Sequence, residues 1–239
     1  MILGVMQPYF FPYFGYFDHI SRCDKWVVFD IAQYTPKTWM NRNRILHPAE
    51  GWQYVRVDLK KTHRNDLISS VHLVSLTDSM ERLTKQLAHY KKKAPFYPAV
   101  IELVRHGMLN AATDRLVDVN ISSISAVCEY LGIPFKPIVA SAQAYDLPPI
   151  SHPGQWALEI SRLEGADTYI NPPGGRNLFR PEEFRNAHIR LGFVPSPNFV
   201  YPTPGYHFEE KLSIIDVLMW NSPESVRSQL GRLEVDYVE

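Results

Sequence analysis

The sequence predicts an α/β fold with a Rossmann-like parallel sheet, forming one domain over residues 1–239. A short apolar run, Ile2–Met6, leads directly into a turn rich in proline and glycine. A second apolar run, Trp26–Asp30, follows after a helical stretch from Tyr16 to Arg22. The order of strand, turn, helix and strand predicts two parallel strands joined by a right-handed crossover.

Composition and charge exclude several classes of protein. The chain has 45% hydrophobic residues, and its 25 basic side chains balance its 25 acidic ones, so no basic field attracts nucleic acid. Cys23 and Cys128 stand far apart, which fits a reducing compartment and no metal site. No run approaches the roughly 18 apolar residues of a membrane span, and the amino terminus resembles no signal peptide. We therefore expect a cytoplasmic protein with a small-molecule substrate.

The turn after the first strand, Gln7–Phe17, has the sequence QPYFFPYFGYF and is the first candidate site. Its two prolines stop regular structure, and its glycine permits a close backbone approach. In open α/β folds, ligands bind at the carboxyl ends of strands, where this turn lies. We expect a pocket rather than a plug of core aromatics, because so many phenols need polar partners. The predicted substrate-binding residues are Gln7, Tyr9, Phe10 and Gly15, and the predicted catalytic residues include Tyr13 and Tyr16.

The second candidate site follows the second strand. Residues 35–50 predict a loop or β-ribbon over the strand ends, and Trp52–Leu59 alternates like a half-exposed strand. Amide and guanidinium groups in this stretch suit phosphate, carboxylate or sugar hydroxyls. The alternative is a solvated β-turn, which collects the same residue types. The candidates here are Asp30, Gln33, Trp39, Asn41, Arg42 and Asn43.

A mainly helical segment occupies residues 76–132. Three helical patterns, Asp78–Tyr90, Phe96–Gly107 and Leu116–Leu131, follow one another without a strand. Asp114 is the expected N-cap of the third, and Gly132 its C-cap. We expect an inserted helical layer or a lid over the site.

The last third of the chain returns to alternating strands and helices. Phe135–Ala140 and residues 165–170 predict strands, Ser151–Gly165 predicts a helix, and 193–200 predicts a strand or extended run. A short helix at 181–184, a buried helix at 212–220 and a final amphipathic turn at 226–230 complete the pattern. Asn171 and Arg176 follow a strand and are candidate ligands, as is Ser213, for which a helix-capping role is the alternative. His152 and His207 are candidate general bases, with surface or capping roles as the alternative.

Several blocks of the sequence resemble the WbqC-like family. They are QPYFFPYFGYFDHI, DKWVVFDIAQYTPKTWMNRNRI, KKKAPFY, LGI, GADTYIN and FEEKLSIIDVLMW, in this order along almost the whole chain. The resemblance implies a cytoplasmic protein of O-antigen, other polysaccharide or natural-product biosynthesis. Lys93 lies in the KKKAPFY block beside Ala94 and Pro95, and this placement makes it a third candidate catalytic residue.

The beginning of the chain also looks like that of nucleotidyltransferases of the HIGH superfamily. The turn Pro12–Tyr16 stands where those enzymes carry His-x-Gly-His, with tyrosines replacing both histidines. A tyrosine donates a hydrogen bond but cannot act as a cationic imidazole. The motifs GxGxxG, GxxxxGKS, GxSxG and HExxH are absent from the sequence, so no phosphate loop, serine nucleophile or metal site is predicted.

The leading interpretation is a transferase that moves an acyl, aminoacyl or nucleotidyl group in a crevice at the strand ends. Its substrate would be a nucleotide-linked amino sugar, and ATP or another nucleotide is the candidate cofactor. The alternative is a non-catalytic binding or scaffolding protein of a polysaccharide assembly complex. The sequence leaves the donor, the acceptor and the oligomeric state open.

Overall fold

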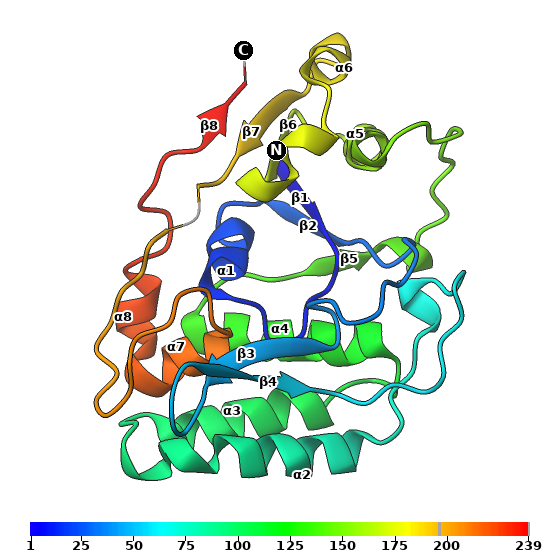
Figure 1. The fold of residues 1–239 in the computed structure, drawn as a ribbon. Helices are drawn as coiled ribbons and strands as arrows, with labels where there is room; N and C mark the ends of the chain where they lie inside the picture. The colour runs from blue at the N-terminus through cyan, green and yellow to red at the C-terminus, as the bar shows by residue number, and fades with distance from the viewer. Residues whose placement is uncertain (196, 239) are drawn as a thin grey trace.

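The centre of the molecule is a six-stranded sheet, seen in a computed structural model that describes residues 1–195 and 197–238. The strand order is β5-β2-β1-β6-β7-β8, and all neighbours are parallel except β7 and β8 (Figure 1). Counted along the chain, these strands follow the order 3-2-1-4-5-6, which is the Rossmann arrangement. The predicted parallel pairing of the first two strands is confirmed. The strands are β1 (Ile2–Met6), β2 (Lys25–Val28), β5 (Pro137–Val139), β6 (Thr168–Asn171), β7 (Arg190–Phe193) and β8 (Asp236–Tyr237).

The sheet separates two hydrophobic cores, because alternate residues of its strands point to opposite faces. Trp26 and Val28 of β2 join the larger core with α1 (Phe14–Ile20), whereas Val27 joins the smaller one. Gly4 is required in β1, since a Cβ there would lie 2.7 Å from the Trp26 ring. The indole therefore packs directly on the backbone of the central strand.

The larger core lies between the sheet and a helical layer, the lower half of Figure 1. The layer contains α2 (Leu76–Leu87), α3 (Tyr97–Leu109), α4 (Leu116–Leu131), α7 (Ile214–Trp220) and α8 (Pro223–Arg227). Gly132 ends α4 in a left-handed conformation, as predicted. The predicted N-cap of α4 is wrong: Arg115 occupies that position, and the Asp114 carboxylate instead bonds Lys60 and His72.

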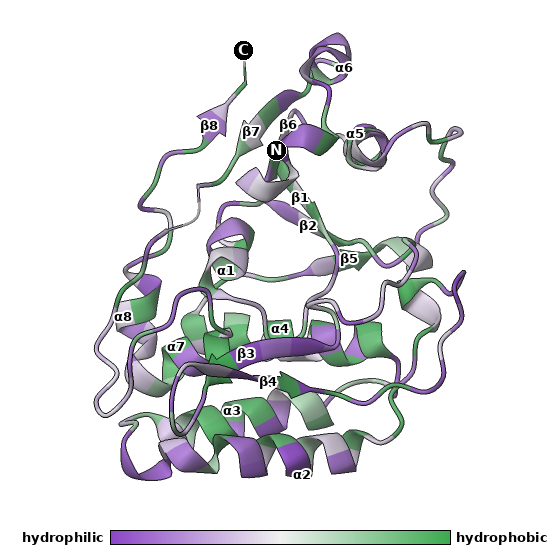
Figure 2. Ribbon diagram, viewed as in Figure 1, coloured by the Kyte–Doolittle hydropathy of each residue, from purple (hydrophilic) through white to green (hydrophobic). Residues whose placement is uncertain are grey.

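Above the helical layer runs a two-stranded ribbon formed by β3 (Arg42–Leu46) and β4 (Trp52–Arg56) (Figure 1). The pairing is antiparallel, and β3 begins with hydrophilic residues and ends with the apolar Ile45 and Leu46 (Figure 2); three of its residues are buried. The expected β-ribbon between residues 35 and 50 is thus confirmed, and the expected strand after Trp52 is three residues shorter than predicted.

The smaller core is covered by α5 (Pro153–Leu163) and α6 (Pro181–Asn186). Of the expected strand or extended run at 193–200, the strand is misplaced: β7 ends at Phe193, the described residues after it up to 200 have no regular structure, and position 196 lies outside the described residues. Strand β8 was not predicted. Short 3-10 helices occupy Ile68–Ser70, Ala88–Lys92, Ala140–Ala142 and Pro173–Leu178, the last of these shortly after β6. Within the described ranges, no helix combines the length and apolarity needed to cross a bilayer.

Candidate functional site

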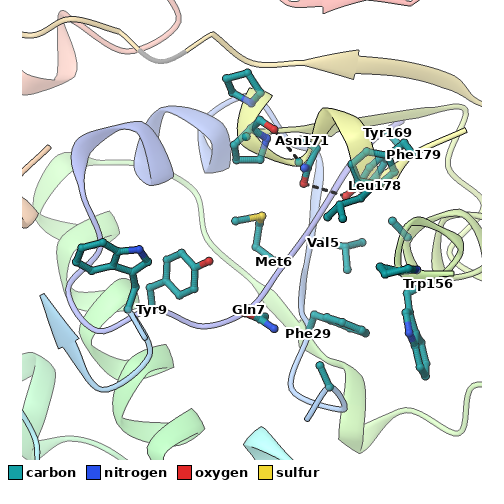
Figure 3. Close-up of a pocket in the computed structure, with 18 of the residues that line it drawn as sticks. Val5, Met6, Gln7, Tyr9, Phe29, Trp156, Tyr169, Asn171, Leu178 and Phe179 are labelled. Atoms are coloured by element: carbon teal, nitrogen blue, oxygen red, sulfur yellow. Dashed lines mark hydrogen bonds between the residues drawn. The ribbon is translucent and has the colours of Figure 1, made fainter. Parts of the chain in front are cut away.

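A cavity of about 1100 Å³ opens at the carboxyl ends of β1 and β6. These two strands are neighbours in the sheet, and the chain continues from them in opposite directions, so the cavity lies at the topological switch point. Figure 3 shows Tyr9 facing Phe29 and Trp156 across the cavity, with Val5, Met6 and Gln7 of β1 and its following turn between them. The location is the one the sequence predicts for a ligand.

Buried side chains hold the aromatic turn that follows β1. Asn43 donates hydrogen bonds to the carbonyls of Phe10 (3.1 Å) and Phe11 (2.8 Å), and Ser213 donates to that of Phe11 (2.7 Å). Asn120, from α4, donates to the Pro8 carbonyl at 2.9 Å. Buried carbonyls need such partners. The ribbon, α4 and the start of α7 therefore fix one irregular turn, which forms a wall of the cavity.

The three tyrosines of this turn have different environments. Tyr16 is fully buried and donates to the Gln7 carbonyl (2.9 Å), so it holds the backbone and does not line the cavity. Tyr9 and Tyr13 line the cavity, and their hydroxyls make no hydrogen bond with the described residues. Burial raises the pKa of Tyr13 to about 12, with a further increase from Tyr9, so its phenol is neutral at physiological pH.

Gly15 positions the Tyr13 ring. A Cβ on Gly15 would lie 2.6 Å from a carbon of that ring, so any other residue would displace it. The predicted close approach at Gly15 is therefore made by a side chain of the same turn. Gly15 does not line the main cavity but a smaller one of about 320 Å³, which shares Tyr13 and Lys211 with it.

On the opposite wall, His152 precedes the first turn of α5 and lines the cavity. Its Nε2 lies 2.8 Å from Oε2 of Glu183, which lies in the first turn of α6 and also accepts from Arg180. Burial acts to raise the pKa of Glu183, but the bonds from His152 and Arg180 outweigh it and lower that pKa. Because Glu183 is an ionised acceptor, Nε2 carries the proton and Nδ1 remains a base.

The placement of His152 depends on a second close approach. A Cβ on Gly154 would lie 2.2 Å from the carbonyl oxygen of Leu178, so only glycine lets α5 begin against the segment after β6. The first turn of α5, and with it His152, is thereby brought to the end of β6. Nearby, the amide of Asn171 accepts from Tyr169 (3.1 Å) and donates to the Pro172 carbonyl (3.2 Å). Both hydrogen bonds are drawn in Figure 3.

The ribbon wall supplies Trp39 and Arg44. The Arg44 guanidinium lies 5.5 Å from the centre of the Trp39 ring and 5.0 Å from that of Trp52. Its Nη2 donates to the Lys211 carbonyl at 3.3 Å, and the Lys211 side chain lines the same cavity. Arg44 and Lys211 thus bring two cationic side chains to one end of the site.

The structure brings together about half of the residues predicted from the sequence. The predicted residues that line the cavity are Gln7, Tyr9, Tyr13, Gln33, Trp39, Asn43, His152 and Asn171. The predicted residues that do not line it are Phe10, Gly15, Tyr16, Asp30, Asn41, Arg42, Lys93, Arg176, Ser213 and His207.

Most of these outlying residues have other partners. Asp30 accepts from the backbone and hydroxyl of Ser141, and Arg42 stacks on Tyr54 at 4.1 Å. Lys93 donates to the Gly205 carbonyl (3.2 Å) and lies over the Tyr206 ring. Arg176 pairs with Asp236 and covers Phe193. These contacts explain why their polar groups are directed to the fold rather than to the cavity.

The sequence analysis did not include Glu183, Trp156, Phe29 and Lys211 among the candidates for the site. The pairing of His152 with Glu183 joins residues 31 positions apart, and no short motif encodes that spacing. His152 itself was predicted as a candidate general base, and it lines the cavity. In the part of the chain that the structure describes, no three His, Cys, Asp or Glu residues cluster as metal ligands.

Comparisons with known proteins agree with the sequence motifs. The family model of the WbqC-like protein family matches residues 7–228. The chain is also similar to the uncharacterized protein Rv1507c of Mycobacterium tuberculosis. Those two sequences are 25% identical over 224 residues, which cover 90% of this chain and 92% of the relative. No solved structure matches the chain.

Proposed function

The chain belongs to the WbqC-like protein family, and we propose that it is a transferase that acylates or aminoacylates a nucleotide-linked amino sugar. The observation that carries the proposal is the His152–Glu183 pair at the wall of the switch-point cavity. An imidazole held by an ionised carboxylate is the usual arrangement of a general base. Such a base activates an amine or hydroxyl of a bound acceptor.

The chemistry follows from the proton positions on His152. Nδ1 would take a proton from the acceptor amine as its nitrogen attacks the acyl carbonyl and the new C–N bond forms. The tetrahedral intermediate then expels the donor's leaving group, which the imidazolium reprotonates. Glu183 would keep the ring orientation and, as an ionised carboxylate, would face the positive charge of the imidazolium. No covalent enzyme intermediate is needed.

The lining of the cavity supports a substrate of this class. A volume of about 1100 Å³ is at the upper end of ordinary ligand pockets and suits a sugar joined to a nucleotide. Tyr9, Trp39, Phe29 and Trp156 present aromatic rings on which a base or a pyranose ring can stack. The free hydroxyls of Tyr9 and Tyr13 supply hydrogen-bond donors to sugar oxygens.

Nucleotidyl transfer is less well supported by the same residues. In the HIGH superfamily this turn carries two histidines. In this chain Tyr13 and Tyr16 stand in their places, and Tyr16 is buried. A phenol is neutral or anionic and never carries the positive charge of an imidazolium, so Tyr13 cannot supply the cation that a phosphate transition state favours. The resemblance of this turn to that of the HIGH superfamily therefore supports only the place where a ligand binds. Acyl transfer is the reaction we propose.

The proposal is tested by a thermal-shift panel followed by a transfer assay. The panel contains ATP with magnesium, UDP- and dTDP-amino sugars and acyl-CoAs. A ligand at a hundred times its Kd raises the stability by about 2.7 kcal/mol. We expect an amino-sugar nucleotide to stabilise the protein. We also expect the H152Q variant to lose the acylation of that nucleotide. An absence of any shift, together with stoichiometric recovery of a glycosyltransferase, would support the scaffolding alternative instead.

A further inference from the structure

We propose that Arg44 and Lys211 form a subsite for the diphosphate group of the ligand. The inference rests on the proposed function because both concern the same cavity. It adds the chemical group by which this cavity holds the substrate. The observation behind it is a charge imbalance. The chain is neutral overall, yet the described residues that line the cavity include Arg44 and Lys211 and no aspartate or glutamate.

Neither cation has an acidic partner. Among the described residues, no carboxylate lies within ion-pair distance of Arg44 or Lys211, whereas most other arginines of the chain pair with an aspartate or glutamate. Glu209 and Glu210 precede Lys211 but line the smaller cavity. Two unpaired cations at one end of a concave site attract an anion, because low-dielectric walls focus their field.

Several protein contacts already orient Arg44. Its guanidinium lies near the Trp39 and Trp52 rings, and its Nη2 donates to the Lys211 carbonyl. Its backbone N–H donates to the Asn43 side chain (2.8 Å), and its carbonyl accepts from the Ser213 N–H (2.8 Å). The Nε atom is buried and has no protein partner. A guanidinium fixed in this way binds phosphate oxygens with little loss of side-chain entropy.

The choice of a diphosphate follows from the pair of side chains. Arginine presents a planar fork that matches two phosphate oxygens, and lysine adds a mobile point charge. Nucleotide sugars, ATP and coenzyme A all carry a diphosphate, so the subsite recognises chemistry that these three donors share. Stacking of a base or sugar on the neighbouring Trp39 would then place the rest of the ligand along the cavity towards His152.

The test is a calorimetric titration with inorganic pyrophosphate, UDP, ADP and coenzyme A, on the wild type and on R44Q and K211Q. The matched control is R42Q, which removes a cation from the same strand at a residue that stacks on Tyr54 and does not line the cavity. Loss of a charge-assisted contact predicts a decrease in pyrophosphate affinity on the order of tenfold or more for R44Q, and little change for R42Q.

Equal weakening by R42Q and R44Q would overturn the inference, as would an absence of binding by all four probes at millimolar concentration. Because Lys211 is exposed, K211Q tests the subsite even if R44Q fails to fold. The probe that binds most tightly identifies the donor class. If R44Q loses affinity for pyrophosphate while H152Q keeps its turnover, the subsite is supported and the proposed function is refuted. If R44Q keeps its affinity while H152Q loses its turnover, only the subsite is refuted.

Discussion

The two walls of the cavity are built in different ways. The ribbon wall is cationic and aromatic, with Arg44 close to the Trp39 and Trp52 rings, and its described residues that line the cavity include no histidine. The α5 wall carries one histidine, oriented by a carboxylate from the next helix. We infer that the ribbon wall binds the ligand and the α5 wall acts on it, so substitutions on the two walls should have different kinetic signatures.

The largest effect is expected at His152. H152Q removes the general base and should lower kcat by about 10²–10⁴-fold, with the ligand's Kd almost unchanged. Steady-state kinetics and calorimetry on the same preparation measure both quantities. H207Q is the matched control, because His207 is exposed and does not line the cavity. A large loss of affinity in H152Q would mean that the α5 wall also binds.

The next effect is on stability and concerns the turn between the walls. N43A leaves the carbonyls of Phe10 and Phe11 without the amide that holds them, which should cost roughly 2–4 kcal/mol of the free energy of unfolding. Denaturant unfolding gives the value. N41A should cost much less, since the Asn41 amide makes a single 3.4 Å bond. Similar losses in both variants would show that the turn does not depend on Asn43.

The pH dependence of stability provides a third test, away from both walls. Burial lowers the pKa of His19 from 6.5 to about 4, more than its bond to the Ile170 carbonyl raises it. The unfolded chain therefore binds the proton first, so the folded state loses stability as the pH falls from 6.5 to 4, by up to about 3 kcal/mol. H19Q should flatten the curve of melting temperature against pH in this range. An unchanged slope would contradict the burial of the neutral imidazole.

The smallest effects are expected at two tyrosines three residues apart. Y13F should reduce turnover by roughly tenfold or less, because a hydroxyl free in the cavity is lost. Y16F should leave turnover unchanged and cost about 1 kcal/mol of stability, because the Tyr16 hydroxyl only holds the Gln7 carbonyl. Kinetics and melting curves on both variants check this contrast. A fall in turnover with Y16F alone would assign the catalytic role to the buried residue.

The sequence predicted the sheet well because its strands are short apolar runs between turn residues. The runs at Ile2–Met6 and Trp26–Asp30 need only local pattern and crossover handedness to be paired. It also predicted a candidate site at the end of β1, where a cavity opens, because open α/β sheets bind ligands there. The strand alternative at 193–200 was wrong because β7 is only four residues long and β8 only two, too short for a clear alternation.

Which side chains face the cavity could not be predicted as well. Tyr13 and Tyr16 are both tyrosines of the same turn, so the sequence does not distinguish them. Only the tertiary contacts of Tyr16 bury it. Asn41 and Asn43 are likewise equivalent as loop residues, but pairing in β3 directs Asn43 to the aromatic turn. Glu183 becomes part of the site through α6, a contact with no local signature. These assignments depend on long-range packing, which local periodicity does not encode.

The most direct test of the division between the walls is to measure Kd and kcat for R44Q and H152Q with one ligand, the diphosphate compound that stabilises the wild type most. We predict that R44Q raises Kd on the order of tenfold with kcat nearly kept, while H152Q keeps Kd and loses kcat. If both variants change Kd and kcat by the same factors, binding and chemistry are not separated between the ribbon and α5, and the account is contradicted.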